Sequence, residues 1–255
     1  MSDTNPSSAL PVISIITVCY QAGATLEATI QSVIAQSWPA VEHIIVDGGS
    51  TDQTQQIIFK YRDHIAKSCS EKDEGLYDAM NKGLRMATGD YVFFLNADDL
   101  LFDKDTLRDA ISRCPSADVL YGEAQFIDQK GNALGLRSER TPHQVPENLN
   151  WRSLRLGMVV SHQAFIVKRA LAPEFDLQYK VCADIDWMIR CLKKTGCCCH
   201  TRLIISKFRI GGTSKQQQKK AWKERYAILA KHYGKTANFF NHLYIAGRYL
   251  LSKRY

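Results

Sequence analysis

No apolar run in the sequence approaches the ~20 residues that a membrane-spanning helix requires, so we expect no transmembrane segment. Residues 1–10 are polar and contain no apolar core, which predicts a disordered start and no secretory signal. With 45% hydrophobic and 23% charged residues, the composition is typical of a soluble globular protein. From the 255 residues we therefore expect a cytoplasmic protein with either one large α/β domain or two small ones.

The eight cysteines are too scattered to suggest a disulfide framework, and a chain of this length does not need one. We therefore expect reduced thiols. The exception to the scatter is Cys197-Cys198-Cys199, which His200 follows. A zinc site is not predicted there, because neighbouring residues of a strand point to opposite faces and cannot converge on one ion. Buried cysteines that act as small hydrophobic residues explain the pattern better.

Acidic residues are nearly absent from residues 215–255, which carry ten Lys and Arg residues and one acidic residue. The net charge of +7 therefore belongs to this C-terminal tail, and the remaining chain is slightly acidic. Within the tail, apolar residues at helical spacing follow a basic cluster. The apolar positions are Phe240, Leu243, Tyr244, Gly247, Leu250 and Leu251, the basic cluster is Lys215, Lys219, Lys220, Lys223 and Arg225, and Lys253 and Arg254 close the pattern.

Two interpretations of this basic amphipathic helical tail remain open. It suits the surface of an anionic membrane, where an apolar face inserts and cations contact the headgroups. Alternatively, the apolar stripe packs on the preceding domain and the lysines are solvated. Nucleic-acid binding is not predicted, because an apolar segment follows the basic cluster where a surface of base-stacking aromatic residues would be required.

The stretch from Gly89 to Asp99 is the most informative one in the chain. Its five hydrophobic residues, 91–95, are too few for a helix and indicate a strand buried on both faces. The run ends in Asn96, Asp98 and Asp99. Ligands of open α/β sheets bind beyond the carboxyl ends of strands, and adjacent carboxylates repel unless a cation or hydrogen-bond donors offset their charge. The stretch predicts a divalent cation bound through oxygen, although a cap on a helix beginning near residue 103 is the alternative.

Hydrophobic runs and turn signals predict a single α/β unit with a mostly parallel central sheet flanked by helices. Strands are expected at 12–19, 43–46 and 91–95, with helices after Thr25, through Tyr61, through Met86 and over 104–114. From Val119 the pattern becomes mixed, with short strands at 119–122 and 125–127, an interrupted strand within 151–167 and a helix over 183–192. No long linker separates the two halves, 11–118 and 119–214, so we expect them to share one core.

Several segments in the same order carry a resemblance to a known family. They are Ser14–Tyr20, Ile45–Asp52, Asp73–Gly83, Leu95–Asp99 and Ala183–Asp186. Together they resemble the family 2 glycosyltransferases, which have the GT-A nucleotide-diphospho-sugar transferase fold, and most of all the bacterial enzymes that build exopolysaccharide or O-antigen. The resemblance covers about residues 11–215. It has two departures, since Asn96 replaces the first acidic residue of the usual Asp-x-Asp and no Gln-x-x-Arg-Trp is present, which argues against a processive synthase.

The resemblance implies an inverting, metal-dependent glycosyltransferase with a nucleotide-diphospho-sugar donor and Mn²⁺ or Mg²⁺ as cofactor. It implies Asp99 as the direct metal ligand, with Asp98 sharing the ion or holding the ribose hydroxyls. The implied nucleotide-binding residues are Thr17, Cys19, Tyr20, Asp47, Asp73, Asn81, Lys82 and Asp98. The implied acceptors are glycans or sugars on polyprenyl-diphosphate lipids in surface polysaccharide biosynthesis, which would place the protein at the inner face of the inner membrane.

An inverting transfer needs a base that deprotonates the acceptor hydroxyl. The resemblance assigns this role to Asp184, with Asp186 as the second candidate. The alternative for both is a favourable charge at a helix N-terminus. The resemblance also makes His162 a candidate substrate contact, and Tyr77 could stack on a sugar or base.

Two other functions fit the same fold less well. A sugar nucleotidylyltransferase would be expected to carry a Gly-rich loop with Arg and Lys after the first strand, but Cys19–Gly23 contains no basic residue. A non-catalytic nucleotide-sugar binding protein is favoured only by Asn96.

Overall fold

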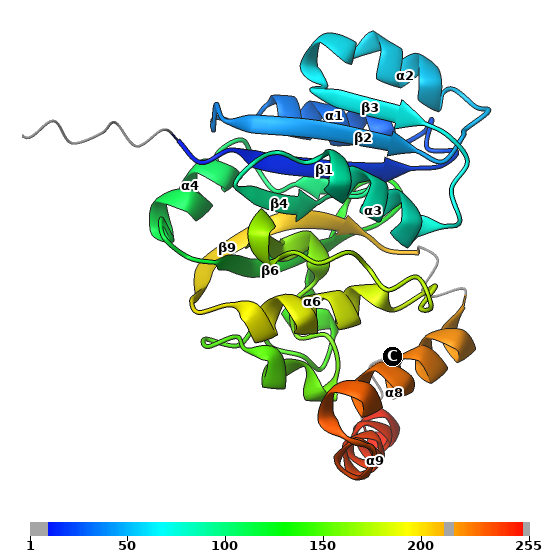
Figure 1. Ribbon diagram of the computed structural model, residues 1–255, viewed down its shortest axis with the longest axis vertical. Helices are drawn as coiled ribbons and strands as arrows, with labels where there is room; N and C mark the ends of the chain where they lie inside the picture. Colours follow the sequence, from blue (N-terminus) through cyan, green and yellow to red (C-terminus); the bar gives the residue numbers. More distant parts are fainter. Residues whose placement is uncertain (1–9, 212–216, 252–255) are drawn as a thin grey trace, which may run out of the picture.

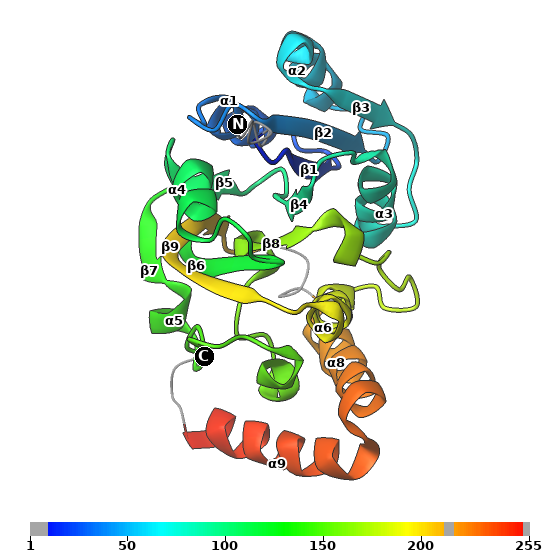
Figure 2. The ribbon, with the colours of Figure 1, turned by 60° about the vertical axis from the view of Figure 1, so that its left-hand side comes forward.

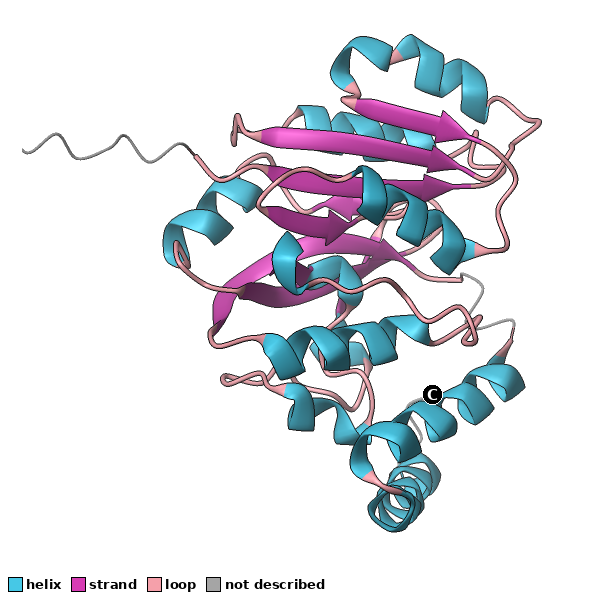
Figure 3. Cartoon of the chain, viewed as in Figure 1, coloured by secondary structure: helices cyan, strands magenta, loops and turns pink. Residues whose placement is uncertain are grey.

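The computed structural model describes residues 10–211 and 217–251. Within these residues, one sheet of nine strands runs through the molecule in the order β3-β2-β1-β4-β8-β6-β9-β5, with β7 paired to β6 (Figure 1, Figure 3). The first half of the sheet is parallel and consists of β1 (Ile13–Cys19), β2 (Val41–Asp47), β3 (Lys67–Ser70) and β4 (Tyr91–Phe94). Every residue of β1 and β4 is buried, as the continuous hydrophobic runs predict.

The second half of the sheet is mixed, which corrects the expectation of a mostly parallel sheet. Its strands are β5 (Leu100–Leu101), β6 (Val119–Ile127), β7 (Ala133–Leu136), β8 (Phe165–Lys168) and β9 (Cys198–Arg209). β8 lies antiparallel between β4 and β6, whereas β9 runs parallel to β6. The sequence predicted two short strands where β6 is continuous, and it missed β3, β5 and β9.

Four helices lie in the first half of the chain. They are α1 (Leu26–Ile34), α2 (Thr54–Lys60), α3 (Leu76–Met86) and α4 (Thr106–Arg113). The last of them, α4, packs on β9 of the second half of the sheet. α3 packs directly on β1 and β2. Its Gly83 makes this close approach possible, because a Cβ at that position would collide with the side chain of Ile16.

Only the last part of the interrupted strand predicted within 151–167 is a strand, namely β8, and helical turns take the place of the rest. These turns are η2 (Trp151–Leu156) and η3 (His162–Ala164), and the other short elements of the chain are η1 (Arg62–His64), α5 (Arg137–Arg140) and η4 (Arg169–Leu171). η3 leads straight into β8, so the pair His162 and Gln163 lies at the start of that strand. The apolar composition of the segment therefore reflects burial, not a continuous strand.

Three longer helices lie in the second half of the chain: α6 (Ala183–Lys194), which precedes β9, and α8 (Gln218–Tyr233) and α9 (Lys235–Leu251), which follow it. α8 lies against α6 and α9 crosses beneath it (Figure 2). Ala221, Ile228 and Leu229 of α8 are buried, so this part of the tail packs on the domain. The predicted positions Lys215, Lys253 and Arg254, and the side chains of Leu250 and Leu251, lie outside what the structure describes. No described helix is long and apolar enough to cross a bilayer.

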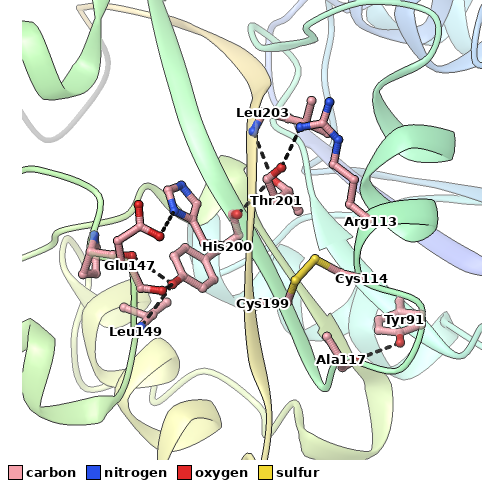
Figure 4. Close-up of a disulfide and its surroundings, with 12 residues drawn as sticks. Tyr91, Arg113, Cys114, Ala117, Glu147, Leu149, Cys199, His200, Thr201 and Leu203 are labelled. Carbon is pink, nitrogen blue, oxygen red and sulfur yellow. Dashed lines mark hydrogen bonds and ion pairs between the residues drawn. A yellow bond between two sulfur atoms is a disulfide. The ribbon is translucent and has the colours of Figure 1, made fainter.

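Cys114 and Cys199 form a disulfide, which corrects the expectation that all thiols are reduced (Figure 4). The bond joins the residue after α4 to β9, which are 85 residues apart in the sequence. No cysteine spacing could indicate this pair, because it depends on α4 packing against β9. Cys182 and Cys191 are free and buried, and burial raises the pKa of both thiols, to about 12 for Cys182. These two act as small hydrophobic residues, as predicted.

Candidate active site

The carboxyl ends of β1 and β2 form one side of the site. Asp47, the last residue of β2, has no exposed surface. Its carboxylate accepts hydrogen bonds from the Ser50 backbone N–H at 3.0 Å and from the hydroxyl of Ser70 at 2.6 Å, and also from the Ser50 hydroxyl and Gln55. Burial alone would raise the pKa of Asp47, but these hydrogen bonds outweigh it and lower the pKa. In this structure Asp47 therefore fixes the loop after β2, and its predicted contact with the base would require these bonds to open.

Tyr20, Gly48 and Asp73 come together at the same strand ends. Tyr20 is 65% exposed. Gly48 lies between the other two, since a Cβ there would collide with the Asp73 carboxylate and meet the Tyr20 ring at 3.4 Å. The other Asp73 oxygen accepts a hydrogen bond from the Gly75 N–H at 2.9 Å. An exposed aromatic ring beside a side-chain-free loop can receive a planar base.

Other predicted nucleotide contacts are committed to the protein itself. The Thr17 hydroxyl lies 3.0 Å from His43 Nε2, and the Cys19 thiol faces Val46 and Asp47. Asn81 exchanges two hydrogen bonds with the backbone of Phe175, at 3.0 and 2.6 Å. The Lys82 ammonium pairs with Glu71 at 2.8 Å. These four side chains therefore make contacts within the first half of the domain or to Phe175, and they stabilise the fold around the ends of β1 and β2.

Tyr77 does not face the cleft, which corrects its assignment as a substrate contact. It is buried, its hydroxyl donates to the Val181 carbonyl at 2.9 Å, and its ring stacks on Phe175. Its position in α3 directs it toward the second half of the core, where a substrate cannot reach it.

The two aspartates after β4 have different environments. Asp99 has no exposed surface, and both its carboxylate oxygens accept hydrogen bonds, from Gln163 Nε2 at 2.9 Å and from the Arg209 backbone N–H at 3.0 Å. Burial and the neighbouring Asp98 raise the pKa of Asp99 well above its usual range. In this structure β9 and η3 hold the oxygens of Asp99 inside, so its predicted direct contact with a metal would require these hydrogen bonds to open.

Asp98 is the carboxylate left for a cation. Burial raises its pKa, and its own backbone N–H, Arg209 and His162 offset this only in part. Two residues earlier, Asn96 Oδ1 is buried and finds no hydrogen-bond donor among the described residues. A carboxylate and an amide oxygen without donors, in one loop beyond a strand, fit the oxygen ligands that Mg²⁺ and Mn²⁺ prefer. These two side chains offer oxygens of the kind that binds such an ion, but the described residues contain no group of three or more His, Cys, Asp or Glu side chains that could hold a metal.

Asp184 lies in the first turn of α6 and meets His162. Its Oδ2 is 3.2 Å from His162 Nδ1, and its Oδ1 accepts the Ile185 N–H at 2.9 Å. The Asp184 side chain keeps 16% of its surface exposed. His162 also helps to lower the pKa of Asp98, but less than the Asp98 backbone N–H and Arg209 do.

Asp186 points away from this group. Its carboxylate is fully buried and is paired with Arg190 Nε at 2.6 Å, His232 Nε2 at 2.8 Å and Lys231 Nζ at 3.3 Å. A carboxylate that already accepts from Arg190, Lys231 and the His232 ring is a poor proton acceptor. This corrects the second candidate for the base and gives Asp186 a structural task between α6 and α8.

A model of the family Glycosyl transferase family 2 matches residues 14–173, which is more than half of the chain. The chain belongs to this family. This match confirms the predicted resemblance and identifies the protein as a glycosyltransferase, and it sets aside the nucleotidylyltransferase and the non-catalytic binding protein.

Named relatives agree with the family. A PGL/p-HBAD biosynthesis glycosyltransferase of Mycobacterium bovis is 32% identical over 195 residues, which cover 72% of this chain and 70% of the relative. The putative teichuronic acid biosynthesis glycosyltransferase TuaG of Bacillus subtilis is 42% identical over 101 residues, or 38% of this chain and 40% of the relative.

Solved structures confirm the GT-A fold. Residues 1–349 of S. aureus TarS in complex with UDP superpose with a TM-score of 0.69 at 19% identity, covering 95% of this glycosyltransferase and 73% of that chain. The match covers only 39% of a longer TarS chain. Glucosyl-3-phosphoglycerate synthase of Mycobacterium tuberculosis, with Mn²⁺ and UDP bound, gives a TM-score of 0.60 at 17% identity, covering 87% and 79%.

Sequence reasoning missed three residues that position the site of this glycosyltransferase. Arg209 donates its Nε to the Asp98 carbonyl at 3.2 Å, and Gln163 holds Asp99. Glu224 of α8 accepts three successive backbone N–H groups just before α6, those of Lys180, Val181 and Cys182, at 3.0, 2.8 and 3.0 Å. Glu224 had one available signal, since it is the single acidic residue of the basic tail.

Proposed function

We propose that this glycosyltransferase transfers a sugar, with inversion, from a nucleotide-diphospho-sugar to a hydroxyl group of a glycan or lipid-linked acceptor in surface polysaccharide biosynthesis. The observation that carries the proposal is the contact of 3.2 Å between His162 Nδ1 and the partly exposed carboxylate of Asp184, in the first turn of α6. This contact orients a carboxylate that is suited to accept a proton.

Asp184 would act as the base. The acceptor oxygen attacks the anomeric carbon while the bond from that carbon to the diphosphate oxygen breaks. The acceptor proton passes to the Asp184 carboxylate, and the nucleoside diphosphate leaves with the bonding electron pair. Attack from the face opposite the leaving group inverts the configuration. His162 would orient Asp184 through the 3.2 Å contact to Oδ2.

Asp98 and the Asn96 amide oxygen would hold Mn²⁺ or Mg²⁺. When bound, such an ion offsets the negative charge that develops on the diphosphate. Asp99 would position Asp98 without touching the ion, because its hydrogen bonds with Gln163 and Arg209 hold the loop that contains both aspartates. Arg209 Nε on the Asp98 carbonyl fixes the same loop.

Tyr20, Gly48 and Asp73 would receive the nucleotide. The TarS structure contains UDP, which supports a nucleoside diphosphate in this fold, and an exposed Tyr20 ring can stack on a uracil. Asp73 stands beside the glycine loop where sugar hydroxyls of a nucleoside would need an acceptor.

Thermal unfolding in the presence of UDP-, GDP- or dTDP-sugars with Mn²⁺ tests the donor assignment. A ligand that binds only the native state raises the unfolding temperature. One nucleotide series should stabilise the wild type, and Asp98→Asn should lose the Mn²⁺-dependent part of that shift. Asp63→Asn, which changes an exposed carboxylate in η1, should keep it. No shift with any nucleotide sugar, or an equal shift in the absence of Mn²⁺, would contradict the assignment.

A peripheral position at an anionic membrane is the finer part of the proposal. α9 exposes Phe239, Phe240, Leu243 and Tyr244, each by more than half of its surface. Monomeric soluble proteins rarely leave a contiguous apolar patch on one helix, and such patches mark protein or membrane contacts. The enzyme would meet lipid-linked acceptors at that membrane surface. Lys219, Lys220 and Lys223 of α8 are exposed and would be attracted to anionic headgroups.

A further inference from the structure

A cavity of about 520 Å³ lies between the second half of the sheet and the C-terminal helices. Asp184 and His162 stand on its wall, and α8 and α9 contribute its other side through Ala221, Trp222 and Ile245. Figure 2 shows these helices beside and beneath α6, at the end of the molecule opposite β1, β2 and β3. The volume falls within the range of small-molecule sites.

The cavity is mostly apolar. Phe126 and Phe208 lie together on it, with ring centroids 5.5 Å apart, and Met158, Leu156 and Ile185 extend the same lining. A pocket that received only hydroxyl-rich sugar would be expected to present hydrogen-bond partners along its length. Arg137, Gln218 and Arg225 also line the cavity, but most of the lining surface is apolar, which favours a ligand that is apolar over most of its own surface.

The polar end of the cavity carries an atom without a partner. His162 is 9% exposed, and its Nε2 is buried with no hydrogen-bond partner among the described residues. The other ring nitrogen contacts Asp184. Asp184, the proposed base, lines the same cavity, so a hydroxyl group placed at this end would lie beside the carboxylate that accepts its proton, whereas a purely hydrocarbon ligand would offer that carboxylate no partner.

We infer that this cavity binds the acceptor and that the acceptor is an amphiphile in which the hydroxyl-bearing sugar is joined directly to an apolar group. The sugar lies at His162 and Asp184, and the apolar group lies between the Phe126–Phe208 pair and Trp222. This inference rests on the proposed function, since it takes the Asp184 end of the cavity as the site of transfer. It makes α8, the first helix of the basic tail, one wall of the acceptor site.

Binding of 4-nitrophenyl and methyl glycosides of glucose, galactose, mannose and rhamnose tests this inference. The readout is the ¹³C-methyl NMR signals of Met158, Ile185 and Ile245, which report on the cavity without any turnover. At least one aryl glycoside should shift all three signals and bind at least tenfold more tightly than its methyl counterpart. Trp222→Ala, which removes an aromatic wall, and Ala221→Leu, which fills the cavity, should each weaken that binding at least tenfold.

Ala227→Leu is the matched control, because Ala227 is exposed on the same helix and does not line the cavity. It should bind the aryl glycoside as the wild type does. The inference is overturned if no aryl glycoside moves these methyl signals, or if Trp222→Ala and Ala221→Leu both bind as tightly as the wild type. Thermal shifts with the donor, measured on the same proteins, separate the two proposals. Donor binding without aryl binding rejects the cavity alone, and aryl binding without donor binding rejects the proposed function alone.

Discussion

Asp184 and Asp186 lie two residues apart on one helix, yet their surroundings give them different tasks. Asp184 is partly exposed and contacts the His162 ring, whereas Asp186 is buried and accepts from Arg190, Lys231 and His232. The sequence could offer both as a base, since both occupy the first turn of α6. It could not rank them on physical grounds, because His162 and His232 reach this turn from 22 residues before Asp184 and 46 residues after Asp186.

Replacing Asp184 by Asn should lower turnover by ~10²–10⁴-fold, the usual contribution of a general base. Donor affinity should change little, because the amide keeps the shape of the side chain and lies away from Tyr20 and Asp73. Steady-state rates and donor titrations on the same preparation measure both quantities. Turnover within a factor of three of the wild type would remove Asp184 from the mechanism.

The aspartates after β4 show the same limit of sequence reasoning. The run of residues 91–95 followed by carboxylates was enough to place a site at the end of a strand, and the structure has β4 there. Which carboxylate turns inward depends on Gln163 and Arg209, which lie 64 and 110 residues further along the chain. That choice is a property of the folded sheet, not of the local pattern.

Among the elements, the contact between α6 and α8 depends on the charge of Asp186. Burial alone would raise the pKa of Asp186, but His232, Arg190 and Lys231 lower it to about 2. Because the folded-state pKa lies below the unfolded value of about 3.9, the charged form contributes roughly 2 kcal/mol of stability above pH 4. This contribution should be lost as the pH falls from about 4 to about 2.

Urea unfolding at pH 6 and at pH 3 checks this expectation. Asp186→Asn should be less stable than the wild type at pH 6 and should lose less stability on going to pH 3. Asp63→Asn, an exposed carboxylate, should keep the wild-type dependence on pH. Parallel pH profiles for wild type and Asp186→Asn would show that the ion pairs do not hold α8.

The disulfide is a second link between elements, from the end of α4 to β9 (Figure 4). Of the eight cysteines, six should react with a thiol reagent in denaturant without reductant, and eight after reduction. Reduction, or Cys114→Ser, should lower the free energy of unfolding by about 2–4 kcal/mol, since the bond constrains a long loop of the unfolded chain. Eight reactive thiols before reduction would contradict the bond.

Strands with continuous hydrophobic runs could be predicted from the sequence, whereas strands that depend on pairing with remote strands could not. β1, β2 and β4 are buried on both faces, so their sequences identify them alone. β9 is twelve residues long but only partly buried, and its register with β6 shifts twice, which breaks any simple alternation. The boundary of α8 was equally hidden, because its attachment through Glu224 and Asp186 involves residues remote in the sequence.

At the scale of the whole molecule, the two interpretations of the tail divide between its helices. α8 packs on the catalytic domain, whereas α9 leaves Phe240 64% and Leu243 55% exposed. Exposed apolar side chains on α9 and exposed lysines on α8 are the two features that a peripheral protein combines at an anionic bilayer, where the rings insert and the cations are attracted to the headgroups.

The double variant Phe240→Ser and Leu243→Ser should therefore bind vesicles of anionic phospholipid about tenfold more weakly than the wild type, since each apolar side chain contributes about 1 kcal/mol or more when it leaves water. Co-sedimentation with anionic and with zwitterionic vesicles measures the bound fraction, and 0.5 M salt should reduce the anionic component through screening. Phe59→Ser is the matched control, because Phe59 is 67% exposed on α2, in the nucleotide half of the chain. If the Phe240→Ser and Leu243→Ser protein binds as the wild type does, or if the Phe59→Ser protein loses as much, the exposed face of α9 is not a membrane surface. The acceptor would then have to reach the cavity beside Asp184 from solution.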